Sequence, residues 1–157
     1  MSYFISHQTT SFTIRLATSQ DLDSIVESEK QAYHFPWSKK LLQSCLQEQY
    51  TVLIMENEVQ VIGHMIFQKV LDEIHLHNVC IIPKNQAKGL GHQWLKHLNN
   101  YALKHKIKSI ILEVRISNEA AKNLYLQHNY REIGLRKKYY KNGNQSEDAL
   151  VMKAILD

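Results

Sequence analysis

An apolar strand that runs into a glycine-rich turn and then into an amphipathic helix is the feature that most constrains this chain. Residues 78–92 read Asn-Val-Cys-Ile-Ile-Pro-Lys-Asn-Gln-Ala-Lys-Gly-Leu-Gly-His, so the strand stops at Pro83. The first N–H groups of a helix have no partners within the helix, and the helix dipole favours an anion there. Glycines at positions 89 and 91 let a ligand approach the backbone closely. The segment therefore predicts a cradle for a diphosphate group.

Two better-known phosphate motifs are absent from this turn. Neither Gly-x-Gly-x-x-Gly nor a Gly-Lys-Ser/Thr ending occurs, which argues against dinucleotide and nucleoside-triphosphate binding. Gly-x-Gly before a helix is also a common structural turn. The motif by itself therefore leaves a purely structural role open.

Length and composition indicate one globular domain. The 157 residues, 44% of them hydrophobic and 22% charged, are enough for a sizeable core, so we expect a single domain over 1–157. Cys45 and Cys80 lie in a predicted helix and a predicted buried strand, which favours reduced thiols over a disulfide. No apolar run reaches the roughly 18 residues of a membrane span, and residues 1–13 lack the pattern of a secretory signal. We expect a soluble, cytoplasmic protein.

The charge distribution decides little about partners. The net charge of +4 suits a phosphorylated ligand, although most chains of this kind bind no nucleic acid. The basic run 136–141 interleaves lysines with tyrosines, as a single-strand binder can, but a solvated strand is the better interpretation. RNA binding stays a minor alternative, and we do not expect direct nucleic-acid binding.

Hydrophobic periodicity predicts a mixed α/β fold. We expect the order strand, two helices, three strands, helix, strand, helix, two strands. The ranges are strand 12–16, helices from 18 to 33 and 38–49, strands 50–55, 59–70 and 72–82, helix 89–105, strand 108–114, helix 117–128, and strands 130–140 and 148–155. Ser117 is the predicted cap of the helix 117–128. This order gives a mostly antiparallel mixed sheet of about seven strands with helices on both faces. A ligand should bind where the strand before the glycine turn parts from the strand after its helix.

The segment 112–125 carries the residues best suited to proton transfer. Glu113 interrupts the apolar run 110–114, where burial would raise its pKa towards the working range of a base. Tyr125, on the following helix, could give a proton to a leaving group. Glu29 falls on the apolar stripe of the first helix. It is either a partly exposed edge residue or a carboxylate that faces a groove and receives an amine.

Two histidines near Cys80 raise other chemistries. Strand alternation places His75, His77 and Val79 on one face and Cys80 on the other, which argues against a covalent route through the thiol. No third ligand with suitable spacing accompanies the two histidines. We therefore expect no metal site.

The glycine turn and the segment 112–125 together resemble the GNAT family of acetyl-coenzyme A-dependent N-acetyltransferases, whose hallmark is Gln/Arg-x-x-Gly-x-Gly/Ala. The likeness runs from about residue 14 to residue 155. Besides the turn, it includes His34-Phe35-Pro36-Trp37-Ser38, Val70-Leu71-Asp72-Glu73, Leu112-Glu113-Val114-Arg115, Ser117-Asn118, Leu124-Tyr125, Tyr139-Tyr140 and Glu147-Asp148-Ala149.

The resemblance implies a GNAT-like sheet and an enzyme that moves the acetyl group of acetyl-coenzyme A directly to a protein amino terminus. The implied acceptor is the N-terminal alanine of a small-subunit ribosomal protein. A lysine side chain or a small-molecule amine remains an alternative acceptor. A non-catalytic coenzyme A-binding or RNA-associated module is a further alternative, from a different class.

The resemblance also assigns roles to individual positions. Glu113 matches the family's proton acceptor, and Tyr125 matches the proton donor to the departing thiolate. Asn118 matches a side chain that contacts the cofactor. The strand backbone that holds the acetyl and pantetheine parts matches Val79, Cys80 and Ile81. The pyrophosphate loop matches Gln86, Ala87, Lys88, Gly89, Leu90, Gly91 and His92.

Three further expectations concern the geometry of this site. Ala87 stands where the resembling enzymes carry a basic residue, and Lys84 or Lys88 could supply that charge. The strand should be irregular near Val79 or Cys80, because an N–H that leaves its neighbour can bind the thioester oxygen. The first helix, the loop 34–37 and the hairpin at 139–140 should line an acceptor groove open at one end, with Glu29 or a tyrosine hydroxyl near the amine.

Overall fold

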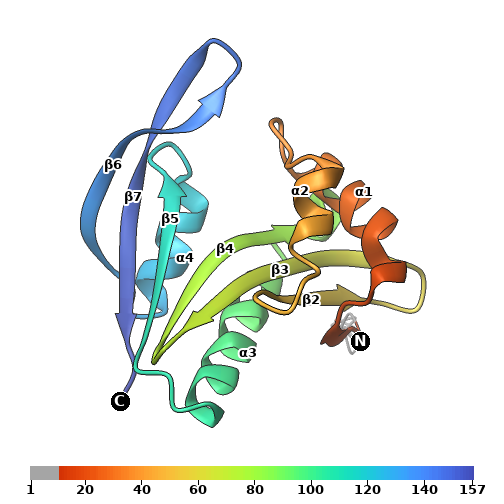
Figure 1. Ribbon diagram of the computed structural model, residues 1–157, viewed down its shortest axis with the longest axis horizontal. Helices are drawn as coiled ribbons and strands as arrows, with labels where there is room; N and C mark the ends of the chain where they lie inside the picture. The colour runs from red at the N-terminus through yellow and green to blue at the C-terminus, as the bar shows by residue number, and fades with distance from the viewer. Residues whose placement is uncertain (1–10) are drawn as a thin grey trace, which may run out of the picture.

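The computed structural model describes residues 11–157, which form one seven-stranded sheet with helices on both faces (Figure 1). The prediction for residues 1–13 falls mostly outside this part of the chain. The strands are β1 (Thr13–Leu16), β2 (Thr51–Glu56), β3 (Val61–Val70), β4 (Glu73–Ile81), β5 (Ser109–Arg115), β6 (Arg131–Asn142) and β7 (Gln145–Ile155). They are arranged in the order β1-β2-β3-β4-β5-β7-β6, and only β4 and β5 pair in parallel. The predicted mixed, mostly antiparallel sheet is confirmed.

Four α-helices cover the sheet. They are α1 (Leu22–Ala32), α2 (Lys39–Ser44), α3 (Leu90–Lys104) and α4 (Glu119–Gln127), with short 3₁₀ turns η1 (Ser19–Asp21) and η2 (Pro83–Asn85). Helix α2 ends at Ser44, five residues before the predicted end. None of the helices in the part of the chain that the structure describes combines the length and the apolar character of a membrane span.

Two apolar cores lie on opposite faces of the sheet. One joins α3 and α4 to the sheet and contains Trp94, Leu98 and Tyr125. The other joins α1 and α2 to the sheet through Ile25, Leu42 and their strand neighbours. Figure 1 shows α1 and α2 on one side of β3 and β4 and α3 on the other. The predicted placement of helices on both faces is confirmed.

The two central strands stay together over only part of their length. Strands β4 and β5 pair from Glu73 opposite Ser109 to Leu76 opposite Leu112, and no further pairs follow between them. Strand β5 then continues beside β7 as far as Arg115, so the sheet opens into a fork between β4 and β5 (Figure 1). This is the parting at which the sequence predicted a ligand site.

Candidate active site

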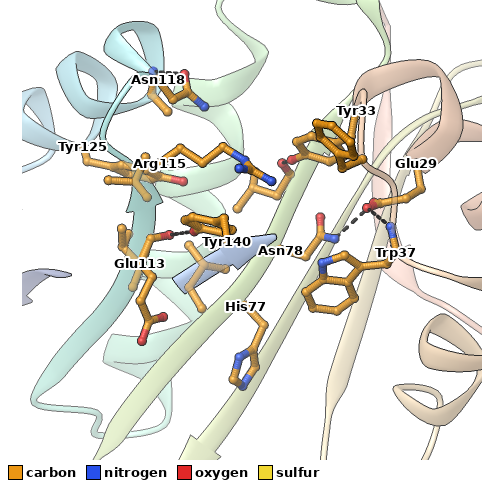
Figure 2. Close-up of a pocket in the computed structure, with 16 residues that line it drawn as sticks. Glu29, Tyr33, Trp37, His77, Asn78, Glu113, Arg115, Asn118, Tyr125 and Tyr140 are labelled. Atoms are coloured by element: carbon orange, nitrogen blue, oxygen red, sulfur yellow. Dashed lines mark hydrogen bonds between the residues drawn. The ribbon is translucent and has the colours of Figure 1, made fainter. Parts of the chain in front are cut away.

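A cavity of about 190 Å³ fills the fork between β4 and β5 (Figure 2). Helix α1, the loop that follows it, both strands, α4 and β6 all contribute to its walls. The lining residues are Glu29, Tyr33, Phe35, Trp37, Leu76, His77, Asn78, Val79, Leu112, Glu113, Val114, Arg115, Asn118, Ala121, Tyr125 and Tyr140. The structure thus brings the predicted residues Glu113, Tyr125, Asn118 and Val79 to one cavity. It does not place Cys80, Ile81 or residues 86–92 on the cavity wall.

Strand β4 carries a bulge at His77. Ile66 of β3 lies opposite Asn78 and Phe67 lies opposite Leu76, so His77 is an extra residue on β4. A bulge of this kind exchanges the two sides of the strand beyond it. The irregularity predicted near Val79 or Cys80 therefore exists, but it lies two or three residues earlier.

Beyond the bulge, backbone groups of β4 face the fork. The Tyr33 hydroxyl donates a hydrogen bond to the carbonyl of Val79, and Gln86 Nε2 donates to the carbonyl of Ile81 at 2.8 Å. In a strand, the N–H of a residue projects to the same side as its carbonyl. The N–H groups of Val79 and Ile81 consequently face the gap left by β5, where they can bind acceptor atoms of a ligand.

The same bulge overturns the predicted face of Cys80. Its thiol lies 3.4 Å from the carbonyl of Ser28 in α1, on the face that also carries His75 and His77, whereas Val79 packs on the opposite face with α3. The face assignment from strict alternation is wrong because the extra residue shifts it by one. Cys80 is still a poor nucleophile, because its side chain is 1% exposed and burial raises the pKa of the thiol to about 12.

Glu113 lies on the cavity wall, and its carboxylate is close to His75 and Arg136. His75 Nε2 lies 2.6 Å from Glu113 Oε2, and Arg136 Nη2 lies 3.4 Å from Oε1. Burial raises the pKa of Glu113, but the hydrogen bond from His75 and the nearby positive charges outweigh it, so that the pKa lies below its usual value. The expectation that burial would raise this pKa towards neutrality is therefore wrong. The carboxylate stays ionised at neutral pH.

Tyr125 approaches the cavity from the other face of the sheet. Ile110, Leu112 and Val114 point into the core beneath α3 and α4, so alternation puts Glu113 on the opposite face. Tyr125 belongs to the α3 and α4 side, and the two side chains share a cavity only because the strands have parted. Burial raises the pKa of Tyr125 to about 12, so the phenol keeps its proton well above neutral pH.

Asn118 begins α4. Its side-chain oxygen accepts a hydrogen bond from Ala121 N at 3.1 Å, so Asn118 is the cap of this helix and the predicted cap Ser117 is wrong. The backbone N–H of Ser117 instead donates to Glu147 Oε2 at 2.9 Å. The capping bond fixes Asn118 at the rim of the cavity, next to the first turn of α4.

The glycine turn leads into α3 just beyond the end of β4. Gly89 has φ +80°, a left-handed conformation that suits glycine, and Ala87 adopts φ +58°. A Cβ on Gly91 would lie 2.8 Å from Leu124 Cδ2, so Gly91 is needed for the close packing of α3 on α4. That role differs from the predicted close approach to a ligand. The first-turn N–H groups of α3 remain available to an anion.

Glu29 is a buried residue that ties three segments together. Its carboxylate accepts hydrogen bonds from Trp37 N at 3.0 Å and Asn78 Nδ2 at 3.1 Å (Figure 2). It also lies 2.9 Å from His64 Nε2. The interpretation of Glu29 as a partly exposed edge residue is wrong, because it is 1% exposed. It lines the cavity, as its alternative interpretation required.

The predicted acceptor groove and the cavity wall share Glu29, Phe35, Trp37 and Tyr140, whereas His34, Pro36 and Tyr139 do not line the cavity. Sequence reasoning missed Tyr33, Asn78 and Arg115. The guanidinium of Arg115 lies over the Tyr140 ring at 4.2 Å and hydrogen bonds to Asn142 Oδ1 at 2.8 Å. Two signals pointed to Arg115: it belongs to the segment 112–115 that carries the family resemblance, and it follows Glu113 at an interval of two, which puts both side chains on one face.

The sequence of the chain matches the acetyltransferase (GNAT) family over residues 21–130. The chain therefore belongs to this family, and it is an acetyltransferase of the class that uses acetyl-coenzyme A. The resemblance noted from the glycine turn and the segment 112–125 is confirmed.

Several named N-acetyltransferases are similar to this chain. The chain is similar to the [ribosomal protein bS18]-alanine N-acetyltransferase of Escherichia coli (strain K12), with 35% identity over 89% of this chain and 95% of that enzyme. The enzyme of the same name from Haemophilus influenzae is 38% identical, over 87% of this chain and 93% of its own length. The crystal structure of the Escherichia coli ribosomal-protein-S18-alanine N-acetyltransferase has a TM-score of 0.87 and 34% identity, covering 92% and 94% of the two chains. Ard1 from Thermoplasma volcanium, at 18% identity and a TM-score of 0.83, shares the fold.

Proposed function

We propose that this acetyltransferase moves the acetyl group of acetyl-coenzyme A to the N-terminal alanine of a small-subunit ribosomal protein, the counterpart of bS18. The observation that carries the proposal is identity of 35% to 38% over nearly the full length of two enzymes named for this reaction. In this proposal residues 1–157 act as one domain. An acceptor on the ribosome also places the enzyme in the cytoplasm.

The backbone around the fork fits acetyl-coenzyme A. The first turn of α3, after Gly89, offers N–H groups to the diphosphate. The backbone of the other residues in the turn 86–92 would bind the same group. The N–H groups of Val79 and Ile81 face the fork and suit the carbonyl groups of the pantetheine and acetyl parts. Asn118 lies at the rim, where it can contact the same chain of atoms. When bound, acetyl-coenzyme A supplies an activated thioester.

Glu113 and Tyr125 are the proposed proton-transfer residues. A free α-amine has a pKa near ~8, so most of it is protonated at neutral pH and must lose a proton before it attacks. Glu113 is ionised and lines the cavity, so it can take that proton directly or through water. Tyr125 keeps its own proton and can give it to the departing sulfur, whose parent thiol has a pKa of about 8.5. This division of roles needs no metal ion.

The acceptor should enter from the side of the α1 to α2 loop. Tyr33, Trp37 and Tyr140 contribute aromatic surface there, and the side chain of Glu29 lies behind it. Holding the amine and the thioester in line at this point supplies a large part of the acceleration. An N-terminal residue with a small side chain fits a cavity of about 190 Å³ that the thioester also enters.

The test is thiol release from acetyl-coenzyme A with peptides that begin with Ala, Ser or Met. Matched peptides with a blocked amino terminus and an internal lysine serve as the control. We expect release with the N-terminal alanine peptide that carries the bS18 sequence, and mass spectrometry should place the acetyl group on its α-amine. Activity on lysine or a small amine alone would reject the acceptor, and binding of coenzyme A without any turnover would favour the non-catalytic module.

A further inference from the structure

Arg115 enters the cavity from the end of β5, and only part of its guanidinium is bonded. Nη1 donates a hydrogen bond to Asn142 Oδ1 at 2.8 Å and lies 3.3 Å from Glu147 Oε1. None of the residues from 11 to 157 accepts a hydrogen bond from Nε or Nη2, and neither nitrogen is among the buried polar atoms without a partner. Figure 2 shows the guanidinium pointing from β5 into the cavity. Arg115 therefore offers unused N–H donors to a molecule that occupies the cavity.

The neighbours of this guanidinium hold it in place. It lies over the Tyr140 ring at 4.2 Å, and the Tyr140 hydroxyl is itself bonded to the carbonyl of Glu113. Glu147 is also held, because its Oε2 accepts the N–H of Ser117 at 2.9 Å. A planar guanidinium that is stacked and bonded through one nitrogen presents its other donors in a defined direction. The arrangement suits recognition of one acceptor oxygen.

The position of Arg115 relative to Glu113 matches the geometry of a peptide amino terminus. The two residues are two apart on β5, so their side chains leave the same face and their Cα atoms are about 7 Å apart. In an N-terminal residue the carbonyl oxygen lies about 3 Å from the amine nitrogen. An amine that gives its proton to Glu113, directly or through water, can therefore bring its own carbonyl to Arg115.

We propose that Arg115 is a specificity-determining residue, whose unused N–H donors bind the carbonyl oxygen of the acceptor's first residue. This inference rests on the proposed function and explains how the site favours an α-amine. A lysine side chain has four carbon atoms next to its amine and no carbonyl within reach of the same donors. A small amine without a carbonyl likewise leaves Arg115 unpaired in the substrate complex, which weakens its binding.

The charges near Arg115 are compatible with an amine substrate. Glu147 faces the guanidinium from β7, and the ionised Glu113 lies on the same face of β5. Arg136, on β6, lies 3.4 Å from Glu113 Oε1. Each of the two guanidinium groups thus has a carboxylate beside it, so Arg115 acts as an oriented donor with little net repulsion of an α-ammonium group.

The experiment crosses enzyme variants with two acceptors. The acceptors are the N-terminal alanine peptide and the same peptide with sulfur in place of its first carbonyl oxygen, which accepts hydrogen bonds weakly. Arg115→Met keeps an unbranched side chain beside Tyr140 but has no donor. Asn142→Ala is the matched control, because it removes the 2.8 Å bond of Nη1 and leaves Nε and Nη2 in place. The measured quantity is the oxygen preference, defined as kcat/KM for the oxygen peptide divided by kcat/KM for the sulfur peptide.

We expect the oxygen preference of the wild type to be about tenfold larger than that of Arg115→Met, and Asn142→Ala to keep the wild-type value. Calorimetry should show that Arg115→Met binds coenzyme A as tightly as the wild type. An equal oxygen preference in the wild type and Arg115→Met would overturn the inference. An equal loss of this preference in Asn142→Ala would also overturn it, because the effect would then come from the loosened hairpin.

A second measurement uses the wild type alone and does not depend on the folding of a variant. Its oxygen preference is divided by the ratio of the rates at which the two peptides react with a free acetyl thioester in solution. A quotient of about ten supports the role of Arg115, and a quotient near one refutes it while the proposed function stands. If the wild type acetylates no N-terminal peptide, the proposed function itself fails.

Discussion

The Tyr140 hydroxyl donates a hydrogen bond of 3.0 Å to the backbone carbonyl of Glu113 (Figure 2), although β7 lies between their strands in the sheet. The side chain of Tyr140 thus reaches across β7 and fixes the hairpin of β6 and β7 to the strand that carries the proposed base. Arg115 covers the Tyr140 ring from the cavity side. This part of the cavity wall therefore combines strand β5 with the hairpin of β6 and β7.

We expect Tyr140→Phe to loosen this wall. The substitution removes one hydrogen bond from a partly buried site and leaves the ring in place, so the free energy of unfolding should fall by about 1 kcal/mol. The KM for the peptide should rise more than kcat falls, because the hairpin positions the acceptor. Urea unfolding and steady-state kinetics measure the two effects. An unchanged KM with a greatly reduced kcat would indicate that the hydroxyl acts in the chemical step instead.

Glu113→Gln should lower kcat by about a hundredfold, because it removes the proposed proton acceptor while keeping the shape of the side chain. In the wild-type enzyme, His75 and Arg136 hold the pKa of Glu113 below its usual value. Protonation of Glu113 therefore should not limit activity above pH 5. The rise of kcat/KM with pH should instead follow the amine, with an apparent pKa near ~8. A limb near pH 6 that disappears in Glu113→Gln would contradict this assignment.

Tyr125→Phe should also lower kcat by about a hundredfold, with little change in coenzyme A affinity, because only the proton on the phenol is lost. Since burial raises the pKa of Tyr125 to about 12, activity should show no alkaline limb from this residue below about pH 11. Stopped-flow or steady-state thiol release measures kcat, and calorimetry measures the affinity.

Tyr130→Phe is the matched control for Tyr125→Phe. The two rings lie 5.5 Å apart, and the buried Tyr130 hydroxyl has no hydrogen-bond partner within residues 11–157. Removing it should leave kcat unchanged and raise the free energy of unfolding by about 1 kcal/mol. Equal loss of activity in both variants would mean that Tyr125 acts through packing.

His64→Leu should destabilise the protein by about 3 kcal/mol. His64 is fully buried, with Nδ1 2.8 Å from Ser28 Oγ and Nε2 2.9 Å from Glu29 Oε2, so the substitution strips a partner from a buried carboxylate. The double variant His64→Leu with Glu29→Gln should recover part of the loss, since the amide carries no charge. Urea unfolding of the single and double variants measures the coupling. If the loss of unfolding free energy in the double variant equals the sum of the losses in the two single variants, His64 and Glu29 do not interact.

Two glycines should differ in their tolerance of alanine. A Cβ on Gly63 would lie 2.2 Å from the backbone oxygen of Cys80, which cannot move without breaking the sheet, so Gly63→Ala should cost about 3 kcal/mol. A Cβ on Gly91 meets only the end of the Leu124 side chain, and Gly91→Ala should cost about 1 kcal/mol. Adding Leu124→Ala should relieve the strain at Gly91 and not at Gly63. Thermal unfolding of the four variants tests this order.

Much of the fold could be predicted from the sequence, because the patterns that indicate its helices and strands are local. The alternation along residues 110–114 and the apolar stripe of residues 94–102 report which side of each element is buried, and they are independent of distant partners. The strand, glycine turn and helix of residues 78–92 likewise depend on neighbouring residues only. These local signals are weaker where a helix begins or ends. For this reason α2 was predicted too long, and Ser117 was predicted in place of Asn118 as the cap of α4.

The sequence by itself determined the order of elements, the family, and the positions of Glu113, Tyr125 and Asn118 on the segments that meet at the fork. Only the tertiary structure decided which side chains face them. The bulge at His77 moved Cys80 to the other face, and His75, 38 residues away from Glu113 along the chain, reversed the expected direction of its pKa shift. Periodicity records burial along one strand, whereas a bulge and a cross-strand charge arise only when two strands are packed in register.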